Sequence, residues 1–287
     1  MSRIGASQAG SQIVQSILGK VSYHAVYDDS IMDALQFARA NGFAGVQVAV
    51  ELPHLSFENT DRAARAGIAA FCAENGLSVS LHAPDDSTSL FVAARSLVAG
   101  TFEYFRGMFE FADQIGSRLI TFHAGAMPSF STAPRPGRAL PDADEAAFRV
   151  ALEENLRRLI DLAHGQLVLC VENVGLTSMV REVLRPHLEA SELALCWDLA
   201  KSHDDQELQE WLWLNVQHVR QVHLHDVCPG YSHQVIGMGT LDFMRYLPRL
   251  AGADVLDFCI EVRPQEEAVE SLANLKRLAR GGRGAAS

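Results

Sequence analysis

Short runs of apolar and β-branched residues alternate along this chain with longer segments whose apolar positions recur every three or four residues. The short runs predict strands at 19–25, 45–50, 77–83, 118–125, 167–173, 193–199, 219–227 and 257–264. The periodic segments predict helices at 30–42, 59–76, 96–116, 144–165, 178–190, 205–215, 240–252 and 266–282. Several of these helices end in glycine, the usual residue at a helix C-terminus.

About eight strand-helix units in one chain predict a single (β/α)₈ TIM barrel in the α/β class, which we place at residues 18–280. An open doubly wound sheet is the alternative, but the first strand is not followed by the G-x-G-x-x-G of a dinucleotide-binding fold. Composition predicts a flexible N-terminal segment at 1–17 and a flexible tail at 281–287. The long loop at 126–142 is interpreted as a rim or lid loop.

The balance of charge argues against polyanionic partners. Formal net charge is −11, and Lys and Arg are scattered singly without a basic run, so binding of nucleic acid is disfavoured. No apolar stretch approaches the roughly 18 residues of a membrane span. The cysteines form no C-x-x-C pair and most lie within apolar runs, which predicts reduced core residues and a cytoplasmic location: Cys72, Cys170, Cys196, Cys228 and Cys259.

The later predicted strands share one unusual feature, a metal-competent side chain at the C-terminal end. These side chains are His82, His123, Glu172, Asp198, His223 and Glu261. A single histidine at such a position is usually a hydrogen-bonded structural residue. Six in succession would meet at one face of a barrel, where a shared divalent cation offsets the cost of burying carboxylates.

The segment "QVHLHDVC" at 221–228 concentrates this chemistry. His223 is expected to point into the barrel mouth, and strand alternation turns His225 to the same side, where it contacts substrate or supports the metal ligands. Asp226 then falls on the opposite side and is expected to orient the following loop. The nearby "IGMG" at 236–239 is expected to allow a close backbone approach rather than to form a phosphate cradle.

With these positions in view, the chain resembles the xylose isomerase-like TIM barrel superfamily, which includes endonuclease IV and many sugar isomerases and epimerases. The motifs that carry the resemblance are "SLHAP" (80–84), "TFHAG" (121–125), "VENVG" (171–175), "CWDLAKSH" (196–203), "VHLHD" (222–226), "HQVIGMG" (233–239) and "IEVRP" (260–264). The resemblance implies one divalent metal ion (Mn²⁺, Mg²⁺, Co²⁺ or Zn²⁺) and no organic cofactor. Its implied ligands are Glu172, Asp198, His223 and Glu261, with Glu172 and Glu261 also the catalytic acid/base pair.

Endonuclease IV-like members of this superfamily bind further zinc ions, and here the chain departs from their pattern. His82 and His123 match a second metal site and are alternatively substrate contacts. For a third zinc, Lys201 stands where the family has histidine and Tyr231 stands where it has aspartate, so only His233 remains. His203 is a possible substitute ligand, although its position also fits a helix-capping residue.

The sequence therefore predicts a metal-dependent isomerase or epimerase of a sugar, a sugar phosphate or a polyol-derived ketose, acting by proton abstraction beside a polarised carbonyl. A zinc phosphodiesterase or hydrolase related to endonuclease IV is the alternative, followed by a sugar lyase or dehydratase and a non-catalytic barrel. Expected substrate-binding residues are Lys201, His225, His233 and Arg263, with His24 and Glu51 as further pocket residues. The expected partner is a small sugar-like molecule, and self-association as a homo-oligomer is open.

Overall fold

The computed structural model describes residues 15–85, 87–128 and 142–280, and its central feature is a closed barrel of parallel strands. The strands follow the order β1-β10-β7-β6-β5-β4-β3-β2 around the barrel. They are β1 (Val21–Ala25), β2 (Gly45–Ala49), β3 (Ser78–His82), β4 (Leu119–Phe122), β5 (Val168–Glu172), β6 (Ala194–Asp198), β7 (Val219–Leu224) and β10 (Asp257–Ile260). The predicted (β/α)₈ barrel is confirmed, and the open sheet is excluded.

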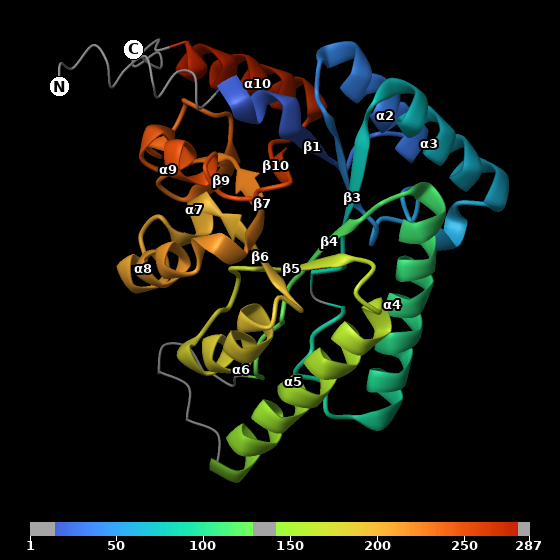
Figure 1. Ribbon diagram of the computed structural model, residues 1–287, viewed down its shortest axis with the longest axis vertical. Coiled ribbons are helices and arrows are strands. Elements are labelled where there is room, and N and C mark those ends of the chain that lie inside the picture. Colours follow the sequence, from blue (N-terminus) through green and yellow to red (C-terminus); the bar gives the residue numbers. More distant parts are fainter. Residues whose placement is uncertain (1–14, 86, 129–141, 281–287) are drawn as a thin grey trace.

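Each barrel strand is followed by at least one helix, and the helices surround the strands (Figure 1). They are α2 (Ile31–Asn41), α3 (Arg62–Asn75), α4 (Arg95–Ile115), α5 (Asp142–Ala163), α6 (Ser178–Glu189), α7 (Leu199–Ser202), α8 (Gln206–Leu214), α9 (Phe243–Leu250) and α10 (Gln265–Ala279), with 3₁₀ turns at Leu18–Lys20, Phe57–Asn59 and Val216–His218. None of the helices in the described ranges has the length and apolar character needed to span a bilayer.

Local side-chain chemistry explains where these helices begin and end. Ser30, Asp61 and Thr177 precede α2, α3 and α6, and the side chain of each accepts a hydrogen bond from a backbone N–H in the first turn. Gly42 and Gly76 follow α2 and α3 with φ of 76° and 65°, a left-handed conformation that glycine adopts without a steric penalty. The predicted boundaries therefore agree with the observed ones to within a few residues.

The main core lies between the outer face of the barrel and the helices. Trp197 on β6 is fully buried, with its ring centroid 4.5 Å from that of Trp213 and 5.9 Å from that of Tyr246. Phe102 and Phe105 on α4 are buried in the same core. Trp197 and these aromatic residues of α4 thus fill the core outside the barrel, which leaves the inward faces of the strands for polar chemistry.

Inside the barrel, a layer of buried polar side chains joins strands that are not neighbours. The Asp257 carboxylate accepts hydrogen bonds from Ser22 Oγ at 2.6 Å, Gln221 Nε2 at 2.7 Å and Ser80 Oγ at 3.3 Å. Gln47 Nε2 in turn donates to Gln221 Oε1 at 3.1 Å. Burial raises the pKa of Asp257 although these donors act to lower it. This layer precedes the strand ends in the sequence and so forms the floor of the site.

Three predicted strands end three or four residues earlier than expected, namely those at 118–125, 219–227 and 257–264. The strand expected at 219–227 ends at Leu224, and Asp226–Cys228 forms a separate strand, β8, that pairs antiparallel with β9 (Tyr231–Gln234). The chain turns away because the buried Asp226 carboxylate accepts hydrogen bonds from the backbone N–H groups of Gly237, Gly239 and Leu241. The expected role of Asp226 in orienting this loop is confirmed.

Some predictions fall on residues that lie outside the described ranges. The interpretation of 126–142 as a rim loop concerns mostly residues 129–141, and the flexible ends concern 1–14 and 281–287. The five cysteines are free thiols; Cys228 is half-buried and the others are buried, in agreement with the prediction of reduced core residues.

Candidate metal centre

A pocket of about 360 Å³ opens at the carboxyl ends of the strands. Most of the predicted site residues line it: His24, Glu51, His82, His123, Glu172, Lys201, His233, Glu261 and Arg263. His223, Asp198 and His225 are fully buried and are not among the lining residues. A larger hollow of about 530 Å³, lined in part by His164 and His218, lies at the amino ends of β5 and β6 and, in the described ranges, holds no metal-competent cluster.

Glu172, the last residue of β5, is the centre of the site. Its Oε2 atom lies 3.1 Å from His82 Nε2, 3.1 Å from His123 Nε2 and 3.4 Å from His223 Nδ1. Burial acts to raise the pKa of Glu172, but the imidazoles of His223, His123 and His82 outweigh it and hold the pKa well below the usual range. Glu172 is therefore a buried carboxylate that stays ionised.

His223 on β7 lies between two carboxylates. Its Nδ1 atom is 3.4 Å from Glu172 Oε2 and 3.4 Å from Glu261 Oε2, and within the described ranges neither ring nitrogen has a hydrogen-bond partner. Burial acts to lower the pKa of His223, but Glu261 and Glu172 together raise it to about 10. The position thus favours a positive charge, whether from a proton on the ring or from a cation beside it.

These donors fit a divalent metal ion. Buried ring nitrogens without partners are costly unless something binds them, and carboxylate oxygen with imidazole nitrogen is a donor set that first-row divalent ions accept. His82, His223 and Glu261 form one compact group of donor atoms, and Glu172, Cys196 and His223 form another. Cys196 was not predicted at this site; its inward position could have been inferred from its place two residues before Asp198 on β6.

The backbone around the donors fixes their orientation. His82 Nδ1 lies 2.8 Å from the carbonyl oxygen of Ala83, which can only accept, so Nδ1 carries a proton. His82 Nε2 is therefore the nitrogen that faces Glu172. Such a carbonyl partner on the second ring nitrogen is the usual arrangement for histidines that bind metals.

Asp198, the fourth predicted ligand, has other close partners. Its Oδ2 atom lies 3.1 Å from His225 Nε2, and its Oδ1 accepts the backbone N–H groups of Ala200 at 2.8 Å and Lys201 at 3.0 Å. Asn173 clamps the same residue, donating to the Asp198 carbonyl at 3.0 Å and accepting its N–H at 2.6 Å. Asp198 is thus absent from the compact donor groups of the described residues, and its role as a ligand stays a prediction.

His225 and His233 stack with ring centroids 4.2 Å apart. The backbone N–H of His233 donates to His225 Nδ1 at 3.0 Å, and His233 Nδ1 lies 2.9 Å from the Glu261 carbonyl oxygen. His225 therefore holds the Asp198 carboxylate in place through Nε2, whereas His233 lines the pocket. Of the two roles expected for His225, this geometry fits support of the neighbouring carboxylate better than contact with substrate.

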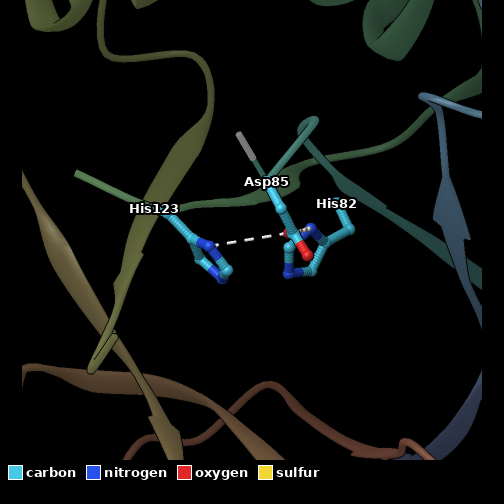
Figure 2. A group of neighbouring side chains, drawn as sticks. All are labelled: His82, Asp85 and His123. Atoms are coloured by element: carbon cyan, nitrogen blue, oxygen red, sulfur yellow. Dashed lines mark ion pairs between the residues drawn. The ribbon is translucent and has the colours of Figure 1, made fainter. Parts of the chain in front are cut away.

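Asp85 is a site residue that the sequence reasoning missed. Its Oδ1 atom lies 3.5 Å from His82 Nδ1 and 3.6 Å from His123 Nδ1, and Figure 2 shows the carboxylate beside the two rings. The three residues form a further group of metal-competent donors. The signal was the spacing in "HAPD", which places a carboxylate three residues after His82.

Three cationic or neutral side chains complete the pocket wall. Arg263 Nη2 donates to His24 Nδ1 at 2.9 Å, and Lys201 lines the opening from α7. Burial, followed by the charge of Arg263, holds the pKa of His24 well below its usual range, so its ring is neutral. His203 does not line the pocket, because its Nδ1 lies 2.7 Å from the Ala200 carbonyl and its Nε2 lies 3.0 Å from Asp204.

Comparison with known proteins identifies the family. The family model described as xylose isomerase-like TIM barrel matches residues 35–278, and the chain belongs to this family. No curated protein matches the sequence.

Solved structures share the fold at low sequence identity. The apo 3-keto-D-glucoside 4-epimerase from E. coli aligns with a TM-score of 0.67 and 18% identity, covering 90% of this chain and 98% of that one. D-psicose 3-epimerase with D-tagatose from Clostridium cellulolyticum gives 0.68 and 9%, with coverages of 91% and 96%. A Thermus thermophilus protein whose crystals were soaked with ZnCl₂ gives 0.68 and 23%, with coverages of 92% and 99%. At these identities the likeness concerns the fold.

Proposed function

We propose that this protein is a divalent-metal-dependent isomerase or epimerase of a sugar, sugar phosphate or polyol-derived ketose. The observation that carries the proposal is the convergence of two carboxylates, Glu172 and Glu261, on the same nitrogen of His223 beside a pocket of about 360 Å³. Epimerases of keto sugars among the proteins of similar fold support this class of reaction.

Glu172, His223 and Glu261 would hold the ion, with Asp198 as the further predicted ligand. When bound, the metal would supply polarisation of the substrate carbonyl and hydroxyl oxygens. Glu172 and Glu261 would then remove the proton from the carbon beside the carbonyl and return one, either to the opposite face or to the neighbouring carbon. The pKa of Glu172 lies well below the usual range, which keeps the carboxylate ionised and suits it to binding the metal, although it also makes Glu172 a weaker base.

Exchange of substrate protons with solvent tests this proposal directly. In deuterated water, a panel of ketoses and their phosphates should include a compound that loses one specific C–H signal by NMR. Glu261→Gln should reduce that exchange at least about 100-fold, because a carboxamide cannot take up the proton. Glu74→Gln on the exposed side of α3 is the matched control. Absence of exchange throughout the panel, or equal exchange in E261Q, would contradict the proposal.

A zinc phosphodiesterase is the second candidate, favoured by one observation. His82, His123 and Asp85 form a donor group next to Glu172, which a second zinc could share. Lys201 at the position of a family histidine, the 70% exposed Tyr231 and the negative net charge favour the isomerase instead. Metal analysis of protein purified without chelator separates the two. One ion per chain that exchanges with Mn²⁺ or Co²⁺ is expected, and two or three tightly held zinc ions would favour the phosphodiesterase.

A further inference from the structure

Arg263 is a pocket residue whose guanidinium forms no ion pair with any of the described residues. It lies two residues after Glu261 and lines the pocket, half-buried. Among the residues that the structure describes, its one hydrogen bond runs from Nη2 to His24 Nδ1 at 2.9 Å, and its buried Nε atom has no partner. Among the described residues, no carboxylate oxygen lies within 4.0 Å of the guanidinium.

The contact with His24 defines the chemistry of this wall. A guanidinium only donates, so His24 Nδ1 is the acceptor and the ring proton sits on Nε2. His24 Nε2 is also buried and has no hydrogen-bond partner in the described part of the chain. The wall therefore presents two buried N–H donors without acceptors, one of them on a charged group. Burial of such groups is costly until an acceptor reaches them, and an anionic acceptor matches both the donors and the charge.

Two simpler roles for Arg263 do not fit these contacts. A surface ion pair would place a carboxylate within 4.0 Å, which the described residues do not provide. A clamp on the metal ligand Glu261 would require a contact with its carboxylate, but Glu261 Oε1 lies instead 3.3 Å from His24 Nδ1. The guanidinium is therefore held in place by a neutral ring and keeps most of its donors for something in the pocket.

We propose that Arg263, positioned by His24, binds an acidic group of the substrate, so that the enzyme acts on a sugar phosphate or a sugar acid in preference to a neutral sugar. This inference rests on the proposed isomerase function and assigns its substrate class. Lys201 lies on α7, directly after β6, and lines the same pocket, so it adds a second cation there. The strands that precede Lys201 and Arg263, β6 and β10, lie on either side of β7 in the barrel. Phosphate and carboxylate groups each present two oxygens that can accept a pair of hydrogen bonds from the guanidinium of arginine.

Calorimetric titration of the purified protein, before and after addition of Mn²⁺, tests the proposal. The probes are inorganic phosphate, D-gluconate and D-fructose, which represent a phosphate, a carboxylate and a neutral sugar. Phosphate or gluconate should bind more tightly than fructose, and the tighter of the two identifies the acidic group. Arg263→Gln should weaken that binding about 10- to 100-fold, the range for one or two charge-assisted hydrogen bonds.

The variants separate a binding role from a general loss of structure. Arg263→Lys keeps the charge but loses the fork, so it should weaken binding less than R263Q does. Arg39→Gln, on the exposed side of α2, is the matched control and should leave the dissociation constant unchanged. Thermal melts verify folding of each variant. Equal anion binding by wild type, R263Q and R263K would overturn the proposal, as would fructose binding at least as tightly as either anion.

The result is distinguishable from failure of the proposed function. If R263Q loses anion binding but no sugar in the panel exchanges a proton with the solvent, the anion subsite is supported and the proposed isomerase reaction is contradicted. Exchange confined to neutral ketoses, together with unchanged binding in R263Q, would support the reaction and overturn the acidic substrate.

Discussion

His223 is the residue on which the metal proposal depends most. It is fully buried, neither of its ring nitrogens has a hydrogen-bond partner among the described residues, and its Nδ1 lies 3.4 Å from a carboxylate oxygen at the end of β5 and 3.4 Å from one just after β10. The flanking carboxylates of Glu261 and Glu172 outweigh burial and raise its pKa to about 10. A proton and a metal ion therefore compete for the same place, because an imidazole nitrogen binds metal only when it is unprotonated.

This competition predicts how metal affinity changes with pH. Between pH 6.5 and 8.5, the affinity for Mn²⁺ should rise by roughly tenfold per pH unit, because each ion bound displaces the proton that His223 retains up to about pH 10. Glu172 adds no such dependence, since its pKa lies well below the usual range and it is already ionised. Dissociation constants from electron paramagnetic resonance of free Mn²⁺ measure this. An affinity that levels off above about pH 6.5, as for an ordinary histidine ligand, would contradict it.

At the scale of elements, local sequence signals were enough to predict the barrel. Each of the eight strand-helix units carries its own apolar run, its own amphipathic segment and, in several cases, a capping residue such as Asp61 or Gly76. None of these signals depends on distant residues. This is why the predicted helices and the starts of all eight barrel strands coincide closely with the observed ones.

The hairpin of β8 and β9 could not be predicted, because distant contacts produce it. The residues "HLHDVC" continue the alternation of β7, so the pattern alone indicates one longer strand. The strand instead ends at Leu224, where the Asp226 carboxylate binds the backbone of Gly237, Gly239 and Leu241. A side chain added to Gly239 would collide with Asp226 and with the Val227 carbonyl, so this loop needs glycine for its close approach.

The sequence was enough to predict which residues lie together in the site, but not which side chains form contacts with one another. Strand ends in a closed barrel must converge, so Glu172, His223 and Glu261 could be placed together from the sequence. The pairing of Asp198 with His225 depends on side-chain rotation, which no spacing reveals. Asp85 was missed because it lies on a loop beyond β3, where periodicity carries no information.

On the scale of the whole molecule, the barrel is tied across its interior as well as around its circumference. Gln221 on β7 accepts hydrogen bonds from Gln47 on β2 and Thr121 on β4, and it donates to Asp257 on β10. These partners include strands on the far side of the closed sheet, since β2 and β4 are not neighbours of β7. One fully buried amide thus links the walls of the barrel directly beneath the layer of metal-competent residues.

Replacement of this amide by an apolar side chain of similar size tests how much the interior layer contributes. Gln221→Leu should lower the free energy of unfolding by about 3 kcal/mol, because Asp257, Gln47 and Thr121 each lose a buried partner. For a chain of this size that corresponds to a fall in Tm of roughly 5–10 °C by circular dichroism. Gln217→Leu, at an exposed position before β7, is the matched control and should change stability by less than about 0.5 kcal/mol.

The pH dependence of this loss shows whether Asp257 is its cause. Burial raises the pKa of Asp257, so its ionised form is the one that most needs the Gln221 donor, which lies 2.7 Å away. The difference in stability between wild type and Q221L should therefore grow as pH rises through the pKa of Asp257 and shrink below it, where the neutral acid can donate a hydrogen bond itself. In a D257N background, the difference in stability that Q221L causes should no longer grow with pH, because no carboxylate remains to ionise. The double variant Q221L/D257N measures this. A pH-independent difference would instead assign the loss to packing of the leucine, and a Tm equal to that of Q217L would show that the interior layer contributes nothing to the closure of the barrel.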